Sequence, residues 1–246
     1  MGVFDSAVEQ VVEVAGAAIH CFLKGEGSSP ALVLLHGNGE DHRCFERQWG
    51  AWSKCYRLIA IDSRGHGAST FGDAPLTIGR MAEDVLAVLG ALGVEKAHVL
   101  GFSDGANVAL DLALAHPDRV SSLVLAGGNL FPAGVKNSVQ LPIVLGYGCC
   151  AFCGLFSKNA RQKASVLGLM VKGPHVAPEA LGAVDCPTLV LAGERDMIKE
   201  EHTCLIASHI PGARLHIIPG ADHMVFTTGS VESCRLVSEF LMEVAQ

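Results

Sequence analysis

A serine lies between two glycines in the segment Gly101-Phe102-Ser103-Asp104-Gly105. An apolar run over 97–100 precedes this segment, and a stretch of helical character over 106–112 follows it. A G-x-S-x-G pattern between a strand and a helix is typical of a nucleophile elbow, a tight turn that leaves the serine hydroxyl accessible. Glycines are needed there because side chains two residues from the serine would collide with the backbone. The chain contains 28 glycines and so could carry the pattern by chance, which makes its surroundings decisive.

A serine hydroxyl becomes a strong nucleophile only when a base removes its proton and an acid orients that base. In a parallel sheet such residues belong on the loops just after the strands. Two loops carry suitable residue types, namely Gly193-Glu194-Arg195-Asp196 and Gly220-Ala221-Asp222-His223. We predict that Ser103 is the nucleophile, His223 the general base and Asp196 the acid, in the order serine, acid, histidine along the chain.

One other acid competes with Asp196 for this role. Glu194 lies in the same loop but nearer to the end of the strand, so we rank it second. The other loop that could supply an acid reads Gly127-Gly128-Asn129 and contains no carboxylate, which supports Asp196.

Attack on an acyl carbon produces an oxyanion that needs two aligned backbone donors. The N–H of Asp104 follows the nucleophile directly at the start of a helix, where the helix dipole also favours negative charge. The second donor is expected from the loop His36-Gly37-Asn38-Gly39. We assign it to the N–H of Asn38 and keep that of Gly39 as the alternative.

Strand-like and helix-like runs alternate along the chain, which predicts an α/β fold with a mostly parallel sheet and helices on both faces. Helices are expected over about 42–54, 77–92, 104–116 and 231–244, with Gly93 ending the second. Eight strands are expected, the first two as a hairpin around Gly16, over 10–14, 17–23, 31–35, 56–61, 97–100, 120–126, 188–192 and 215–219.

One interval is too long for a single crossover helix, because about sixty residues separate the strands that end near 126 and begin near 188. We interpret 131–184 as an inserted helical lid. The core is then formed by 1–130 together with 185–246.

With these motifs the whole chain outside the lid resembles the α/β-hydrolase fold superfamily. The resemblance implies an eight-stranded sheet with a small helical cap, a carboxylesterase-like serine hydrolase and no cofactor or metal. It also implies that His36, Arg64 and His66 brace loops. Five motifs carry it in order: 36–39, Asp62-Ser63-Arg64-Gly65-His66-Gly67-Ala68-Ser69, 101–105, 193–196 and 220–223.

A serine at the elbow disfavours the dehalogenases and epoxide hydrolases of this fold, since the resemblance gives those an aspartate there. Acyl transfer to water remains, on a carboxylic ester, a thioester or a lactone, with C–C bond hydrolysis as an alternative. The Ser-Asp-Gly elbow is also similar to that of valacyclovir hydrolase-like amino-acid ester hydrolases, in which the carboxylate next to the serine receives a substrate ammonium. Here the motif continues as Gly105-Ala106 instead of two glycines. A hydrolase-like protein that only binds a ligand is the last alternative.

The predicted lid differs in charge from the rest of the chain. Between 131 and 178 its charged residues are all basic: Lys136, Lys158, Arg161, Lys163 and Lys172. We expect an apolar acyl pocket whose rim favours anionic substrates, with an ordinary solvated basic helix as the alternative. The apolar stretch 141–156 is too short to span a membrane.

Composition restricts the partners and the compartment. A formal net charge of −7 argues against general nucleic-acid binding, and nine scattered cysteines suggest reduced thiols in a cytoplasmic protein. The pair Cys150 and Cys153 could form a redox site, but small residues in a packed helix explain it better. Met1-Gly2 agrees poorly with a myristoylation signal, and no secretory signal is visible. We expect a small-molecule acyl substrate and no stable membrane insertion, and make no prediction of the oligomeric state.

Overall fold

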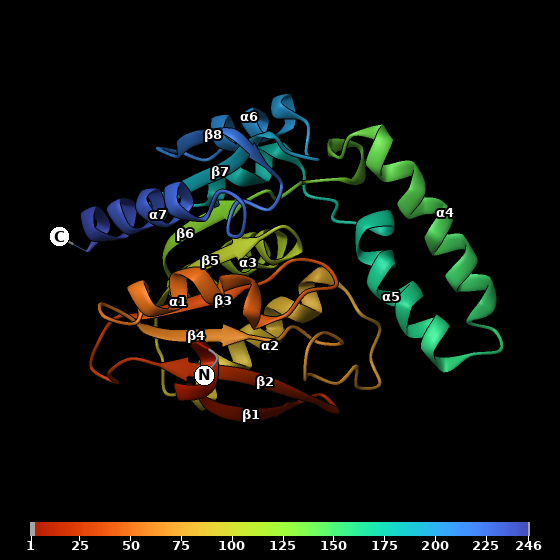
Figure 1. The fold of residues 1–246 in the computed structure, drawn as a ribbon, viewed down its shortest axis with the longest axis horizontal. Helices are drawn as coiled ribbons and strands as arrows, with labels where there is room; N and C mark the ends of the chain where they lie inside the picture. Colours follow the sequence, from red (N-terminus) through yellow and green to blue (C-terminus); the bar gives the residue numbers. More distant parts are fainter. Residues whose placement is uncertain (1–2, 246) are drawn as a thin grey trace.

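Eight strands form one sheet in the order β1-β2-β4-β3-β5-β6-β7-β8 (Figure 1). The computed structural model describes residues 3–245, so the Met1-Gly2 pair considered for myristoylation lies outside the described residues. The β1–β2 and β2–β4 pairs are antiparallel and all other pairs are parallel, which confirms the predicted mostly parallel sheet. The strands are β1 (Val8–Val14), β2 (Ala17–Lys24), β3 (Ala31–Leu35), β4 (Arg57–Ile61), β5 (Ala97–Phe102), β6 (Val120–Ala126), β7 (Thr188–Arg195) and β8 (Arg214–Asp222).

Helices cover both faces of this sheet (Figure 1). Apolar side chains alternate between two buried clusters, as the period of a strand requires. In β3, Val33 and Leu35 belong to the cluster beneath α2, α3 and α6, whereas Leu32 and Leu34 belong to the one beneath α1 and α7. The helices are α1 (Glu46–Trp52), α2 (Ile78–Ala91), α3 (Asp104–Ala115), α6 (Glu200–His209) and α7 (Ser230–Val244).

The helix predicted after residue 77 begins and ends where its sequence signals lie. Thr77 caps α2, because its side chain accepts a hydrogen bond from the N–H of Arg80 at 3.1 Å. The helix ends at Ala91, and Gly93 follows with a φ of +65°, a conformation that glycine adopts without a steric penalty.

Two parts of the fold differ from the sequence-based expectation. The α6 helix was not predicted, since apolar residues between β7 and β8 do not repeat clearly at helical spacing. The stretch expected to be one helix over 42–54 divides into a 3-10 turn, His42–Phe45, and α1. The side chain of Asp41 accepts from the N–H of Arg43 and so caps the 3-10 turn separately.

The insertion between β6 and β7 contains two helices, α4 (Asn137–Cys153) and α5 (Lys158–Lys172), which we call the lid helices. They pack against each other and stand beside the sheet instead of covering one of its faces (Figure 1). In α4 no residue is buried, whereas α5 buries Ala164 and Leu169. None of the described helices is long and apolar enough to cross a membrane. The division at residues 131 and 184 stays a prediction.

Candidate active site

Ser103 lies at the turn where β5 ends at Phe102 and α3 begins at Asp104. Its backbone has φ +54° and ψ −121°, a conformation that is costly for a residue with a side chain. The flanking glycines allow the turn. A Cβ on Gly101 would lie 2.1 Å from the carbonyl oxygen of Gly105, and a Cβ on Gly105 would lie 2.1 Å from that of Leu35.

The structure brings together Ser103, His223 and Asp196. The Oγ of Ser103 lies 3.0 Å from Nε2 of His223, and Nδ1 of the same ring lies 2.7 Å from Oδ1 of Asp196. A carboxylate next to Nδ1 requires the proton on that nitrogen, which leaves Nε2 as the acceptor for the serine proton. This arrangement can activate a serine hydroxyl for attack on an acyl carbon.

Asp196 is held in place by the backbone around it. Its Oδ1 accepts a hydrogen bond from the N–H of Ile198 at 2.9 Å and its Oδ2 accepts from the N–H of Gly193 at 3.3 Å, and the residue is 3% exposed. Glu194, the alternative acid, instead accepts from the N–H of Gly220 at 2.7 Å and is exposed. Of the two acids, Asp196 is the one that is hydrogen-bonded to the His223 ring in the described part of the chain.

Gly127 has a role that sequence reasoning missed. It has a φ of +62°, and a Cβ at this position would lie 2.8 Å from Cε1 of His223. The glycine therefore makes room for the imidazole between the ends of β6 and β8. The sequence singles out the Gly127-Gly128 loop only for its lack of a carboxylate, although two adjacent glycines after a strand are a signal for such a close approach.

The loop after β3 lies against the nucleophile, since a Cβ on Gly37 would lie 3.0 Å from Cβ of Ser103. Within this loop the N–H of Gly37 donates to the Glu40 carboxylate at 3.1 Å, and the N–H of Glu40 donates to the Gly37 carbonyl at 3.2 Å. The N–H groups of Asn38 and Gly39 lie between these two bonds and are the candidates for an oxyanion donor. Asp104 is the first residue of α3, so its N–H has no partner within that helix.

The side chain of Asn38 connects three parts of the site. Its Nδ2 donates to Oδ2 of Asp104 at 2.8 Å and to the carbonyl oxygen of Val166 in α5 at 2.9 Å. The Asn107 amide, one turn along α3, lies 3.4 Å from the other oxygen of Asp104. Burial raises the pKa of the Asp104 carboxyl, and the hydrogen bond from Asn38 is the strongest of the contacts that lower it. The loop after β3, the elbow and the lid thus meet at one amide group.

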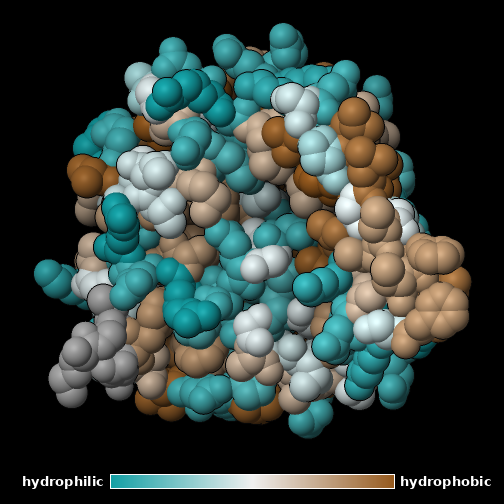
Figure 2. Space-filling view, turned by 45° about the vertical axis from the view of Figure 1, so that its right-hand side comes forward, coloured by the Kyte–Doolittle hydropathy of each residue, from teal (hydrophilic) through white to brown (hydrophobic). Residues whose placement is uncertain are grey.

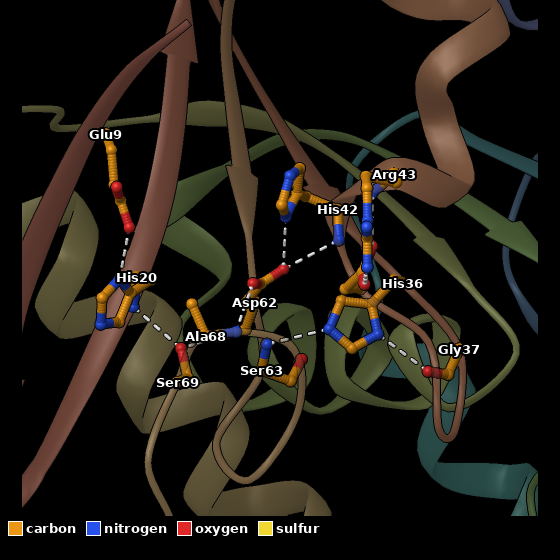
Figure 3. A network of polar contacts seen from close by, with 11 residues as sticks. Glu9, His20, His36, Gly37, His42, Arg43, Asp62, Ser63, Ala68 and Ser69 are labelled. Carbon is orange, nitrogen blue, oxygen red and sulfur yellow. Dashed lines mark hydrogen bonds and ion pairs between the residues drawn. The ribbon is translucent and has the colours of Figure 1, made fainter. Parts of the chain in front are cut away.

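His36 fixes the loop after β3 to the loop after β4 (Figure 3). Its Nε2 accepts from the N–H of Ser63 at 3.0 Å, and its Nδ1 lies 2.8 Å from the carbonyl oxygen of Gly37. A carbonyl only accepts and a backbone N–H only donates, so this ring is neutral with its proton on Nδ1. Burial, with a smaller effect of nearby His66, lowers the pKa of His36 from 6.5 to about 4.

Two further contacts support the same loops. Arg64 forms a buried ion pair with Asp84, with nitrogen–oxygen distances of 2.8 and 2.6 Å. Asp62 accepts from the N–H of Ala68 at 2.9 Å and from both the N–H and Nδ1 of His42 at 2.8 Å (Figure 3). His42 carries no motif in the sequence, so its part in this network was not predicted.

A cavity of about 820 Å³ lies between the lid helices and the start of α2 and α3. Its walls are largely apolar, and three charged residues also line it: Asp111, Arg161 and Lys172. Asn107 and Asn129 line the cavity as well, and their side chains are hydrogen-bonded to each other at 3.1 Å. Because Asn107 also contacts Asp104, the cavity comes within one helical turn of the nucleophile.

Within residues 3–245, no three or more His, Cys, Asp and Glu side chains are grouped as a metal site would require. The nine cysteines are free thiols in this part of the chain.

Comparison with known proteins gives consistent results. A family model described as "alpha/beta hydrolase fold" matches residues 30–148. The serine hydrolase BPHL of Mus musculus is 27% identical over 260 residues, which cover 97% of this chain and 88% of the relative. The 3-oxoadipate enol-lactonase 1 of Acinetobacter baylyi is 35% identical over 207 residues, with 74% and 77% covered. The 2-hydroxymuconate semialdehyde hydrolase of a Pseudomonas strain is 29% identical over 273 residues, with 94% and 93% covered.

Proposed function

Because the chain belongs to the α/β-hydrolase family, we propose that it is a serine hydrolase that cleaves a carboxylic ester, a thioester or a lactone of a small molecule. One observation carries the proposal: the continuous contact from Ser103 through His223 to Asp196, at 3.0 and 2.7 Å. We assign these three residues as nucleophile, general base and orienting acid.

The reaction then follows from the geometry. His223 takes the Ser103 proton on Nε2 as Oγ attacks the acyl carbon, and Asp196 stabilises the resulting imidazolium. The oxyanion is held by the N–H groups of Asp104 and Asn38. His223 next gives its proton to the leaving oxygen or sulfur, and an acyl-enzyme forms. Water, activated by the same imidazole, releases the acid and restores the serine.

We further propose that the cavity under the lid helices receives part of the substrate. Its volume of about 820 Å³ falls in the range of small-molecule sites, and its apolar walls suit an acyl chain. Arg161 and Lys172 line it, which favours a substrate that carries a carboxylate away from the scissile bond. Asp111 lines the same cavity and opposes this preference, so the comparison of charged and neutral esters is informative.

The amino-ester alternative needs Asp104 to receive a substrate ammonium. Asp104 is 4% exposed, its carboxylate already accepts a hydrogen bond from Asn38 at 2.8 Å, and the Asn107 amide lies 3.4 Å from its other oxygen. An ammonium would have to reach a buried carboxylate whose two oxygens already have amide partners. We therefore rank this alternative below a simple ester, together with C–C bond hydrolysis and ligand binding without catalysis.

A panel of p-nitrophenyl esters and acyl thioesters, run on the wild type and on Ser103→Ala, tests the proposal. We expect turnover that Ser103→Ala abolishes, and covalent labelling of Ser103 by a fluorophosphonate probe. Failure of folded wild-type protein to react with the probe would favour a ligand-binding protein. The proposed preference for anionic substrates would be wrong if neutral and carboxylated esters of the same length had equal kcat/KM values and if Arg161→Gln and Lys172→Gln left both values unchanged. A desamino ester that reacts as fast as its α-amino counterpart would remove the amino-ester alternative.

A further inference from the structure

The lid presents a large apolar surface to the solvent. Helix α4 buries none of its residues, and from Asn137 to Ser157 the sequence contains no charged side chain. Five large side chains of α4 and the turn after it are between 61% and 84% exposed: Leu141, Leu145, Phe152, Leu155 and Phe156. We call these five residues the α4 patch. An exposed apolar surface of this kind is typical of a site that binds a partner or a membrane.

The α4 patch forms a ridge, not a groove. Leu141, Leu145 and Phe152 are four and seven residues apart, a spacing that places them along one face of the helix. The ring of Phe152 lies edge-on to that of Phe156, with centroids 6.3 Å apart. The turn between α4 and α5 projects away from the sheet, and apolar side chains gather over the lid at the right-hand edge of the molecule (Figures 1 and 2).

Positive charge begins where the apolar residues end. Lys158 and Lys163 are exposed on α5 just after the patch, and no Asp or Glu occurs between residues 131 and 178. The whole chain has a net charge of −7, so this cationic lid is a local exception. Helix α4, with 17 residues, is about 26 Å long and falls short of the hydrocarbon thickness of a bilayer. Phe and Leu side chains on one helix and lysines on the next supply together the apolar and cationic contacts by which proteins bind a membrane interface.

We propose that the α4 patch docks on an anionic lipid surface. Phe152 and Phe156 would enter the headgroup region while Lys158 and Lys163 contact lipid phosphates. A second copy of the chain fits the patch less well, because two-fold pairing would bring the α5 lysines of both copies close together without a compensating acid. This inference does not depend on which bond Ser103 attacks.

Co-sedimentation of the full chain with vesicles tests the proposal. One set of vesicles contains phosphatidylcholine alone, and the other contains phosphatidylcholine and phosphatidylglycerol in equal parts. We expect binding to the anionic vesicles that weakens at high salt, since salt screens the lysines. The double variant Phe152→Ser/Phe156→Ser should bind at least about tenfold more weakly, because it removes two large apolar side chains. Lys158→Gln/Lys163→Gln should bind anionic vesicles no better than neutral ones.

Val231→Ser is the matched control, since Val231 is 84% exposed at the start of α7 and lies outside the patch. It should bind like the wild type. Circular dichroism and the thermal midpoint establish that every variant is folded. Absence of wild-type binding to anionic vesicles, or equal binding by the double Phe variant, would overturn the proposal. The patch would instead bind a second copy of the chain if light scattering showed a dimer that the Phe substitutions dissociate and if the protein did not bind vesicles. Binding of the patch to an added soluble protein but not to vesicles would also overturn it.

Discussion

Replacing Asn38 by Ala tests whether one side chain couples the lid to the site of attack. The substitution keeps the backbone N–H that we assign to the oxyanion and removes only the amide group. Two hydrogen bonds are lost, at 2.8 Å to Asp104 and at 2.9 Å to the carbonyl of Val166. Any loss of activity would therefore report on the position of the loop after β3, because its donor is still present.

The expected loss of stability and activity follows from the Asp104 carboxylate, which loses its Asn38 partner. A hydrogen bond to a buried carboxylate contributes about 1.5–3 kcal/mol, and Asp104 would retain only the more distant amide of Asn107. For a chain of this length each kcal/mol corresponds to roughly 2–4 °C in the thermal midpoint, so a fall of about 3–12 °C is expected. Removal of a whole oxyanion donor costs about 10²–10³ in kcat. Since the donor is kept, we expect about a tenfold decrease in kcat with little change in KM.

The assay is hydrolysis of a short p-nitrophenyl ester together with thermal unfolding. Asn159→Ala, an exposed asparagine on α5, is the control and should behave like the wild type. Asn38→Asp should be more damaging at neutral pH, since it places a second carboxylate beside Asp104. Its activity relative to that of the wild type should recover in part as the pH falls. The reasoning is refuted if Asn38→Ala keeps both the wild-type kcat and the wild-type thermal midpoint.

Three further predictions concern the elbow, the acid and the brace. Ser103→Gly should be at least as stable as Ser103→Ala by urea unfolding. Glycine adopts a φ of +54° without the strain of about 1–3 kcal/mol that alanine has there, and this gain exceeds the cost of ordering the more flexible glycine on folding. Asp196→Asn should lower kcat by about 10⁴, whereas Glu194→Gln stays near the wild type; the opposite order would exchange their roles. His36 takes up a proton near pH 6.5 in the unfolded chain but only near pH 4 in the folded chain. The free energy of unfolding should therefore fall by about 3 kcal/mol as the pH is lowered from 6.5 to 4. A His36→Gln variant whose unfolding free energy falls equally steeply over this range would contradict the last prediction.

The succession of strands along the chain, and the loops that carry Ser103, Asp196 and His223, could be predicted because each depends on short-range signals. Buried parallel strands are largely apolar, so Ala31–Leu35, and Val120–Ala126 in spite of its two serines, are predicted with the bounds the structure gives. Parallel strands also bring their following loops to one edge of the sheet. That rule places the ends of β5, β7 and β8 at one edge of the sheet, although they lie far apart in the sequence.

The contacts that the sequence did not reveal join residues that belong to different elements of the fold. The bond from Asn38 to Val166 spans 128 residues, and it depends on how α5 packs beside the elbow. The position of His42 likewise depends on Asp62, which lies after a different strand. The sequence shows only that Gly127 lies in a loop without a carboxylate. Its close contact with the His223 ring arises from the placement of β6 and β8 in one sheet. Periodicity describes one element at a time and carries no information on such pairs.

The charge of the lid shows why composition does not determine function. In the sequence its basic residues form one group, but in the structure they have different surroundings. Lys136 donates to the carbonyl of Asp196 at 2.5 Å, Arg161 and Lys172 line the cavity, and Lys158 and Lys163 are exposed near the α4 patch.

This separation has an experimental consequence. If Arg161 and Lys172 act on the substrate while Lys158 and Lys163 act on a lipid surface, the two effects belong to different basic residues of α5. Gln at Arg161 and Lys172 should then change the preference for carboxylated esters without changing vesicle binding, and Gln at Lys158 and Lys163 should do the reverse. A single pair of substitutions that altered both properties equally would mean that the lid acts only through its total charge.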